Sequence, residues 1–140
     1  MTDLSDDALV EGFEACTLGA GQFSHRHHVR IGYLYLKRYD FGEAVSRVSN
    51  GLKALVAHLG LEDKYHETIT VAYMALINER LGRDGDPGDW ESFALANADL
   101  MDVDILYRYY DKDELFSDAA RQTFVMSAGP SKAQRVAAGG

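Results

Sequence analysis

Histidines near the start of the chain are the residues best suited to do chemistry. Three of the five histidines, His25, His27 and His28, lie within four consecutive positions. On a helix that begins after Ser24, His25 and His28 share one face because they are three residues apart, whereas His27 points elsewhere. Imidazole titrates near neutral pH and can both accept and donate a proton. His25 and His28 are therefore candidate catalytic residues.

A second candidate group lies in the stretch YHETIT, which begins at Tyr65. His66 and Thr70 are four residues apart, Tyr73 continues their line, and Glu67 begins a neighbouring line. We expect this helix start to pack beside the first one, so that His66 and Glu67 meet the earlier histidine pair. Tyr65, Thr70 and Tyr73 would then contact a substrate.

Two kinds of chemistry fit these residues. In the acid–base interpretation, the three histidines transfer protons without a cofactor, and Glu67 holds a cation or orients a histidine. In the metal interpretation, the ligands of zinc or non-haem iron are His25, His28, His66 and Glu67. In a simpler alternative none of them acts: the pair lies on a surface turn, and His66 is a core histidine bonded to a backbone group.

A zincin site is excluded by spacing. His66 and Glu67 have the order of the H-E-x-x-H motif, but Thr70 and Val71 stand where the later histidine would be needed. The metal interpretation therefore has no complete motif behind it.

Composition limits the class of partner. The formal charge of −8, from 22 acidic and 14 basic residues, disfavours nucleic acid and anionic membranes but would concentrate a cationic small molecule. Cys16 is the only cysteine, so no internal disulfide can form. The acidic start lacks the pattern of a secretion signal, and no apolar run reaches the roughly 20 residues of a membrane span. These features favour a cytoplasmic protein with a small-molecule substrate.

The elements that must position the candidates are helices. Apolar residues recur at spacings of three and four, which predicts an all-α fold, a compact single-domain bundle of about five to seven helices. The longest predicted helices span residues 5–15, 24–39, 41–58 and 65–81, with Gly60 and Gly82 as stops of the last two. We expect helix 24–39 to be central, because apolar residues cover much of its circumference.

The last part of the chain is predicted to hold shorter helices. Residues 90–100 and 103–110 suggest two, and Asp111 and Glu114 form a D-x-x-E cap before a further one. The domain should comprise residues 1–125. Residues 126–140 are small, polar and aperiodic, as in a disordered tail.

Four stretches together resemble a family of small bacterial proteins. The stretches are FEACTL, FSHRHHVRIGYLYL, YHETIT and LFSDAARQTFV, and the match spans about residues 13–125. The resemblance implies motif roles for Phe13, Glu14, His25, His28, Tyr65, His66, Glu67, Thr68, Phe116, Ser117 and Arg121. The family pattern continues into an acidic, proline-containing end, which the stretch MSAGPSK replaces in this chain.

Such chains resemble some encoded in natural-product pathways, which implies a cyclisation that forms a 2-aminoimidazole from a guanidino aldehyde. The resemblance also adds Glu14, Ser117 and Arg121 as substrate-binding residues. Ring closure with loss of water needs bases and acids but no redox cofactor, and the chain has no Gly-rich nucleotide loop. We therefore predict a lyase that acts as a cyclodehydratase on a small polar metabolite. The alternatives are a metal-dependent enzyme and a non-catalytic helical interaction module, and the oligomeric state stays open.

Overall fold

The computed structural model describes residues 4–127, which form seven α-helices and no strand. The α-helices are α1 (Asp6–Glu14), α2 (His25–Arg38), α3 (Phe41–His58), α4 (Glu67–Asp84), α5 (Trp90–Ala96), α6 (Lys112–Leu115) and α7 (Asp118–Gln122). Short 3₁₀ turns are η1 (Ala20–Gln22), η2 (Glu62–Lys64), η3 (Ala98–Met101) and η4 (Ile105–Arg108). The predicted all-α single-domain bundle is confirmed. In this described range no helix has both the length and the apolar character to cross a membrane.

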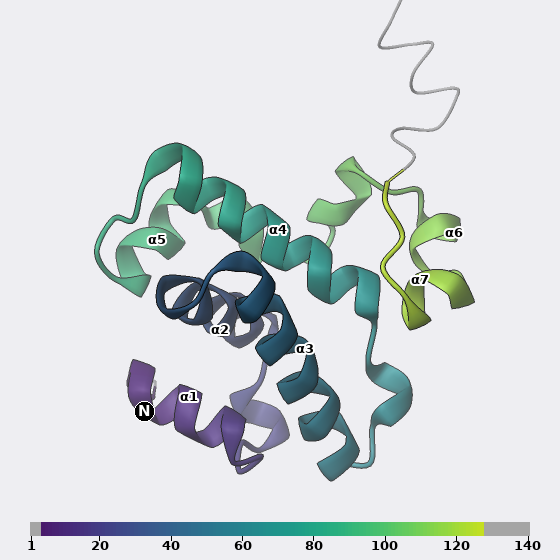
Figure 1. The fold of residues 1–140 in the computed structure, drawn as a ribbon, viewed down its shortest axis with the longest axis horizontal. Helices are drawn as coiled ribbons and strands as arrows, with labels where there is room; N and C mark the ends of the chain where they lie inside the picture. The colour runs from purple at the N-terminus through teal and green to yellow at the C-terminus, as the bar shows by residue number, and fades with distance from the viewer. Residues whose placement is uncertain (1–3, 128–140) are drawn as a thin grey trace, which may run out of the picture.

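Helix α2 lies at the centre, with α1, α3, α4 and α5 around it (Figure 1). Seven consecutive residues from Val29 to Tyr35 are buried, because neighbours cover α2 on nearly every side. The run includes Arg30, which donates from Nη2 to Asp6 Oδ1 at 2.7 Å and so joins α2 to the start of α1. The predicted central position of this helix is confirmed.

The first three helices begin and end where the sequence predicts. The Ser5 hydroxyl accepts from the Ala8 amide at 3.1 Å and caps α1, and Asp40 accepts from the Glu43 amide at 2.9 Å and caps α3. Gly60, after α3, has φ +71°, a conformation that glycine adopts without strain. Local cap chemistry therefore sets these ends.

The prediction for α4 is wrong at both ends. The helix begins at Glu67 rather than near Tyr65, and His66 is its N-cap. It then passes through Gly82 and ends only at Gly85, which has φ +78° and ψ 169°. A glycine inside a helix costs only about 1 kcal/mol, so Gly82 alone does not stop α4.

The predicted D-x-x-E cap is also not formed. Asp111 occupies the N-cap position of α6, but its side chain makes no capping hydrogen bond. Helix α6 ends after one turn, and Ser117 then caps α7 by accepting from the Ala120 amide at 3.2 Å.

The chain after α7 runs back along the start of α4 (Figure 1). Thr68 holds it by hydrogen bonds, and Ser127 bonds to the Tyr109 carbonyl oxygen. Of the tail predicted for residues 126–140, only the first two residues are described; residues 128–140 lie outside the described range.

Candidate functional site

The N-terminal parts of α2 and α4 wall a cavity of about 60 Å³, closed on a third side by α3. Its polar residues are His25, His28, Thr70 and Tyr73, and its apolar residues are Val29, Val48, Leu52, Ile69, Met74 and Ile77. A neighbouring depression of about 150 Å³ shares His28 and Thr70 with the cavity and adds Lys64, Tyr65 and His66. We call the two together the histidine groove. His28 lines both parts of this groove, whereas His25 lines only the cavity and His66 only the neighbouring depression.

His25 is held by a backbone carbonyl from a distant part of the chain. Its Nε2 lies 3.0 Å from the Leu100 carbonyl oxygen in η3, and since a carbonyl only accepts, Nε2 carries the proton. The neutral ring then has its lone pair on Nδ1. Tyr73 meets the His25 ring edge-on at 4.9 Å between centroids and donates its hydroxyl to the Asp102 carbonyl oxygen at 3.1 Å.

His28 has a different environment although it is only one helical turn away. His28 is exposed to solvent, its ring packs on Phe23 at 4.2 Å between centroids, and it lines both parts of the groove. Partial desolvation where the ring packs against the protein, with repulsion from His25 and His27, lowers the pKa of His28 from 6.5 to about 4. At neutral pH this imidazole is uncharged.

Both ring nitrogens of His66 are engaged. Nδ1 accepts from the Ile69 amide at 3.1 Å and caps α4, while Nε2 lies 2.7 Å from the Leu115 carbonyl oxygen and donates to it. The side chain is buried, and desolvation lowers its pKa, an effect that the charge of Arg121 adds to. These bonds are those of a structural histidine, so proton transfer by His66 would require one of them to break.

Glu67 lies beside the groove in a small polar cluster. Its Oε1 accepts from the hydroxyls of Tyr65 and of Ser49, the latter at 3.1 Å. Burial and the neighbouring carboxylate raise the pKa of Tyr65 to about 12, so this phenol stays protonated. Glu67 is not among the residues that line the groove, but Tyr65 is.

Glu14 lies in a different part of the molecule. It accepts from the Tyr35 hydroxyl at 2.6 Å and lines a separate depression with Arg47 and Asn50 on α3. That depression shares no lining residue with the histidine groove. The structure therefore does not bring Glu14 together with the three histidines.

Ser117 and Arg121 do not line the groove and lie at the C-terminal helices. Ser117 caps α7 and also donates to the Glu114 carbonyl oxygen at 2.8 Å. The Arg121 guanidinium lies 5.9 Å from the centre of the Phe116 ring, which in turn meets His66 edge-on. In the structure both residues support the C-terminal helices.

His27 has a role that the sequence reasoning missed. The Ser24 amide donates to His27 Nδ1 at 3.0 Å. His27 is therefore the N3 residue of a capping box at the start of α2, the residue whose side chain accepts from the N-cap amide. The usual motif has Glu or Gln at this position, so only the Ser-x-x-His spacing could have indicated it.

Residues 4–127 contain no group of side chains that fits the metal interpretation. In this range, no three His, Cys, Asp or Glu side chains lie close enough together to hold a metal ion. His66, one of the four predicted ligands, already uses both of its nitrogens. Zinc or iron binding therefore stays a prediction.

Known proteins give no further guide to the groove. The resemblance to a bacterial family rests on short motifs, and it stays a prediction. Comparison of the chain with family models, with curated proteins and with solved structures gives no match.

Proposed function

We propose that the histidine groove is an acid–base active site that closes a small polar metabolite into a ring with loss of water. The observation that carries this proposal is the placement of His25 and His28 on the wall of one cavity whose remaining lining is mostly apolar. Partly enclosed apolar walls strengthen hydrogen bonds from a few polar groups to a bound molecule.

The two histidines are suited to different steps. With Nε2–H donated to the Leu100 carbonyl oxygen, Nδ1 is the ring nitrogen of His25 that is left to accept a proton. His28 has a pKa of about 4, which makes it a weak base at neutral pH. A neutral imidazole still donates a hydrogen bond, so His28 is suited to polarise a carbonyl or a leaving hydroxyl.

The size of the groove favours a small substrate. Its two parts, about 60 and about 150 Å³, fall short of the roughly 300–1,000 Å³ of pockets that hold drug-sized ligands. Among residues 4–127, the groove lining contains no carboxylate. A cationic substrate would therefore be attracted by the net charge of the whole chain and by nearby Glu67.

A guanidino aldehyde fits these requirements and is the substrate class that the family resemblance implies. A guanidine nitrogen attacks the aldehyde carbon, and His25 Nδ1 moves the proton of that nitrogen to the former carbonyl oxygen, which gives a cyclic carbinolamine. His25 then removes a carbon-bound proton as the hydroxyl, polarised by the His28 N–H, leaves. The departing oxygen takes up that proton and goes as water, which completes the aromatic 2-aminoimidazole and returns His25 to its starting form. No electrons are transferred to or from the substrate.

The test is the rate of ring closure of guanidinoacetaldehyde, followed by proton NMR against the rate without protein. We expect His25→Gln and His28→Gln each to slow turnover by about a hundredfold or more. His58→Gln, which removes an exposed histidine from the last turn of α3, is the matched control and should keep the full rate. A full-speed His25→Gln enzyme would overturn the proposal.

A further inference from the structure

Two polar side chains of the cavity wall depend on one short segment of backbone. His25 donates to the carbonyl oxygen of Leu100, and Tyr73 donates to the carbonyl oxygen of Asp102. These carbonyls are two residues apart, in and just after η3. Whatever fixes this segment therefore fixes the His25 ring and the Tyr73 hydroxyl.

The segment has little secondary structure of its own. It is a 3₁₀ turn of four residues, Ala98–Met101, and such turns have poorer hydrogen-bond geometry than α-helices. Leu100 is fully buried, which anchors its side chain but does not by itself aim its carbonyl at His25.

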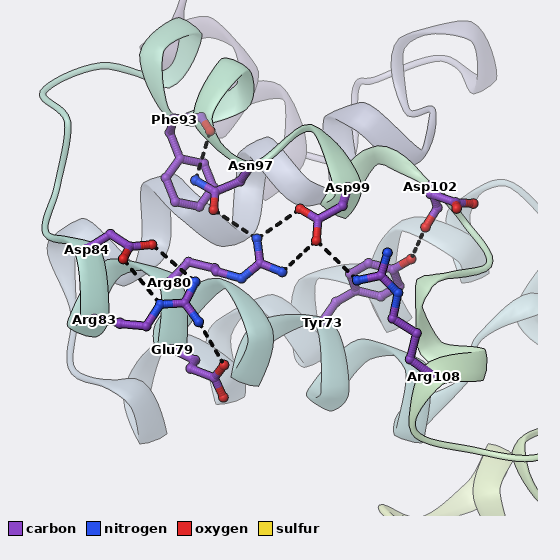
Figure 2. A network of polar contacts seen from close by, with 10 residues as sticks. All are labelled: Tyr73, Glu79, Arg80, Arg83, Asp84, Phe93, Asn97, Asp99, Asp102 and Arg108. Carbon is purple, nitrogen blue, oxygen red and sulfur yellow. Dashed lines mark hydrogen bonds and ion pairs between the residues drawn. The ribbon is translucent and has the colours of Figure 1, made fainter. Parts of the chain in front are cut away.

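A guanidinium from α4 holds this segment (Figure 2). Arg80 donates from Nη1 to Asp99 Oδ1 at 2.9 Å and from Nη2 to Asp99 Oδ2 at 2.8 Å. Nη1 also donates to Asn97 Oδ1 at 3.0 Å, and the Asn97 amide donates to the Phe93 carbonyl oxygen at 3.0 Å. Arg80 thus joins α4 to the end of α5 and to η3.

The burial of this pair sets it apart from the surface ion pairs. The Arg80 side chain is 12% exposed, and a two-pronged pair in such a place is stronger and more directional than a solvated one. Hydrogen bonds from Arg80 are the largest cause that lowers the pKa of Asp99 to about 2, so Asp99 stays ionised at neutral pH. Arg108 adds only a longer contact with Asp99, at 3.4 Å, from an exposed side chain.

We propose that Arg80 and Asp99 are positioning residues for His25: their two-pronged pair holds the Leu100 carbonyl where it keeps the proton on His25 Nε2 and the lone pair on Nδ1. This inference rests on the proposed function, because it assigns Nδ1 as the atom that accepts the substrate proton. Neither residue lines the histidine groove, so neither is expected to touch the substrate.

The test compares Arg80→Gln with Arg83→Gln. Arg83 lies one turn further along α4, pairs with Asp84 at 3.2 Å and is 59% exposed, which makes it a matched control (Figure 2). In nitrogen-15 NMR of the full chain, we expect the solvent exchange of the His25 Nε2 proton to speed up at least tenfold in Arg80→Gln and to stay unchanged in Arg83→Gln. Ring closure of guanidinoacetaldehyde should slow about tenfold in Arg80→Gln alone, through kcat rather than KM.

A folded Arg80→Gln protein with unchanged Nε2 proton exchange would overturn this inference. If Arg80→Gln does not fold, Asp99→Asn, which keeps one acceptor, takes its place with the same expected results. If neither variant folds, the pair serves the fold as a whole and the inference also fails. Failure of the proposed function is distinct, because a full-speed His25→Gln enzyme would remove the active site while leaving the effect of Arg80 on Nε2 exchange intact.

Discussion

Single residues of one type differ sharply in this protein because each meets different neighbours. His25 has a carbonyl on Nε2, His66 has partners on both nitrogens, and His27 caps the helix that carries it. His28 differs again, because the surrounding protein lowers its pKa to about 4. The chemistry available to each ring follows from these contacts and not from the residue type.

The pKa of His28 predicts how stability changes with pH. The unfolded chain protonates this histidine near 6.5 and the folded chain near 4, so between these values the unfolded state binds more protons. His28 should therefore contribute fully to the free energy of unfolding above about pH 6.5, and this contribution should be lost as the pH falls towards 4. The charges that face the ring are His25 and His27, which add repulsion, and the depression beside it also contains Lys64.

Urea unfolding of the wild type and of His28→Gln, at about pH 7.5 and about pH 4.5, checks this. The variant should lose less stability between the two values than the wild type. Some loss should remain in the variant, because burial lowers the pKa of His66 too. Equal losses in the two proteins would contradict the low pKa of His28.

At the scale of elements, the two ends of α4 lie where a simple helix pattern does not place them. Its start is capped by His66, whose other nitrogen donates to the carbonyl oxygen of Leu115, the last residue of α6. Its end is set by Gly85 and not by Gly82. Each end gives a prediction.

Replacing the two glycines with alanine should have opposite effects. A Cβ at Gly82 meets no heavy atom within 4 Å, and this position lies inside the helix, so Gly82→Ala should stabilise the fold by about 0.5–1 kcal/mol. Gly85 has φ +78° and ψ 169°, a region open essentially to glycine only, so Gly85→Ala should cost about 1–3 kcal/mol. Thermal unfolding measures both changes. Destabilisation by Gly82→Ala would mean that α4 ends there after all.

His66 makes two hydrogen bonds, the cap to the Ile69 amide and the bond to the Leu115 carbonyl oxygen, and substitutions can test them separately. His66→Asn keeps a side-chain oxygen that can cap α4 but loses the bond to the Leu115 carbonyl oxygen, whereas His66→Ala loses both. We expect Asn to cost about 1–3 kcal/mol and Ala at least about 1 kcal/mol more, by denaturant unfolding. Equal costs would show that the cap contributes nothing.

For the molecule as a whole, the chain after α7 closes the bundle by returning to α4. Thr68 is fully buried, donates to the Thr123 carbonyl oxygen at 2.9 Å and accepts from the Val125 amide at 3.0 Å. Tyr110 donates to the Val125 carbonyl oxygen at 2.7 Å. One threonine therefore pairs with two backbone groups more than fifty residues away in the chain.

Thr68→Val keeps the shape of the side chain and removes both bonds, so we expect a loss of about 1–3 kcal/mol. The Val125 amide should also exchange its hydrogen faster with solvent. Thr17→Val is the control, because the Thr17 hydroxyl makes only a 3.5 Å contact and is exposed, and it should change little. Unchanged exchange at Val125 would show that Thr68 does not hold this segment.

The sequence by itself determined the first three helices and several candidate residues of the groove. The period of apolar residues predicts α1, α2 and α3 almost to the residue, because helix formation and capping depend on groups within one turn of each other. The same spacing rule identified His25, His28, Thr70 and Tyr73, which all line the cavity. Where capping depended on an unusual residue, as with His66, the local rules failed.

The tertiary structure alone decided what each candidate residue can do. The carbonyl that binds His25 is 75 residues away in the chain, and the one that binds His66 is 49 residues away. The tertiary structure also placed Glu14 beside Tyr35, in a depression apart from the histidines. It bonded Arg80 to Asp99, in the segment whose backbone contacts His25. Proton position and desolvation depend on atoms that touch in space, and residue spacing carries no record of contacts between segments so far apart in the chain.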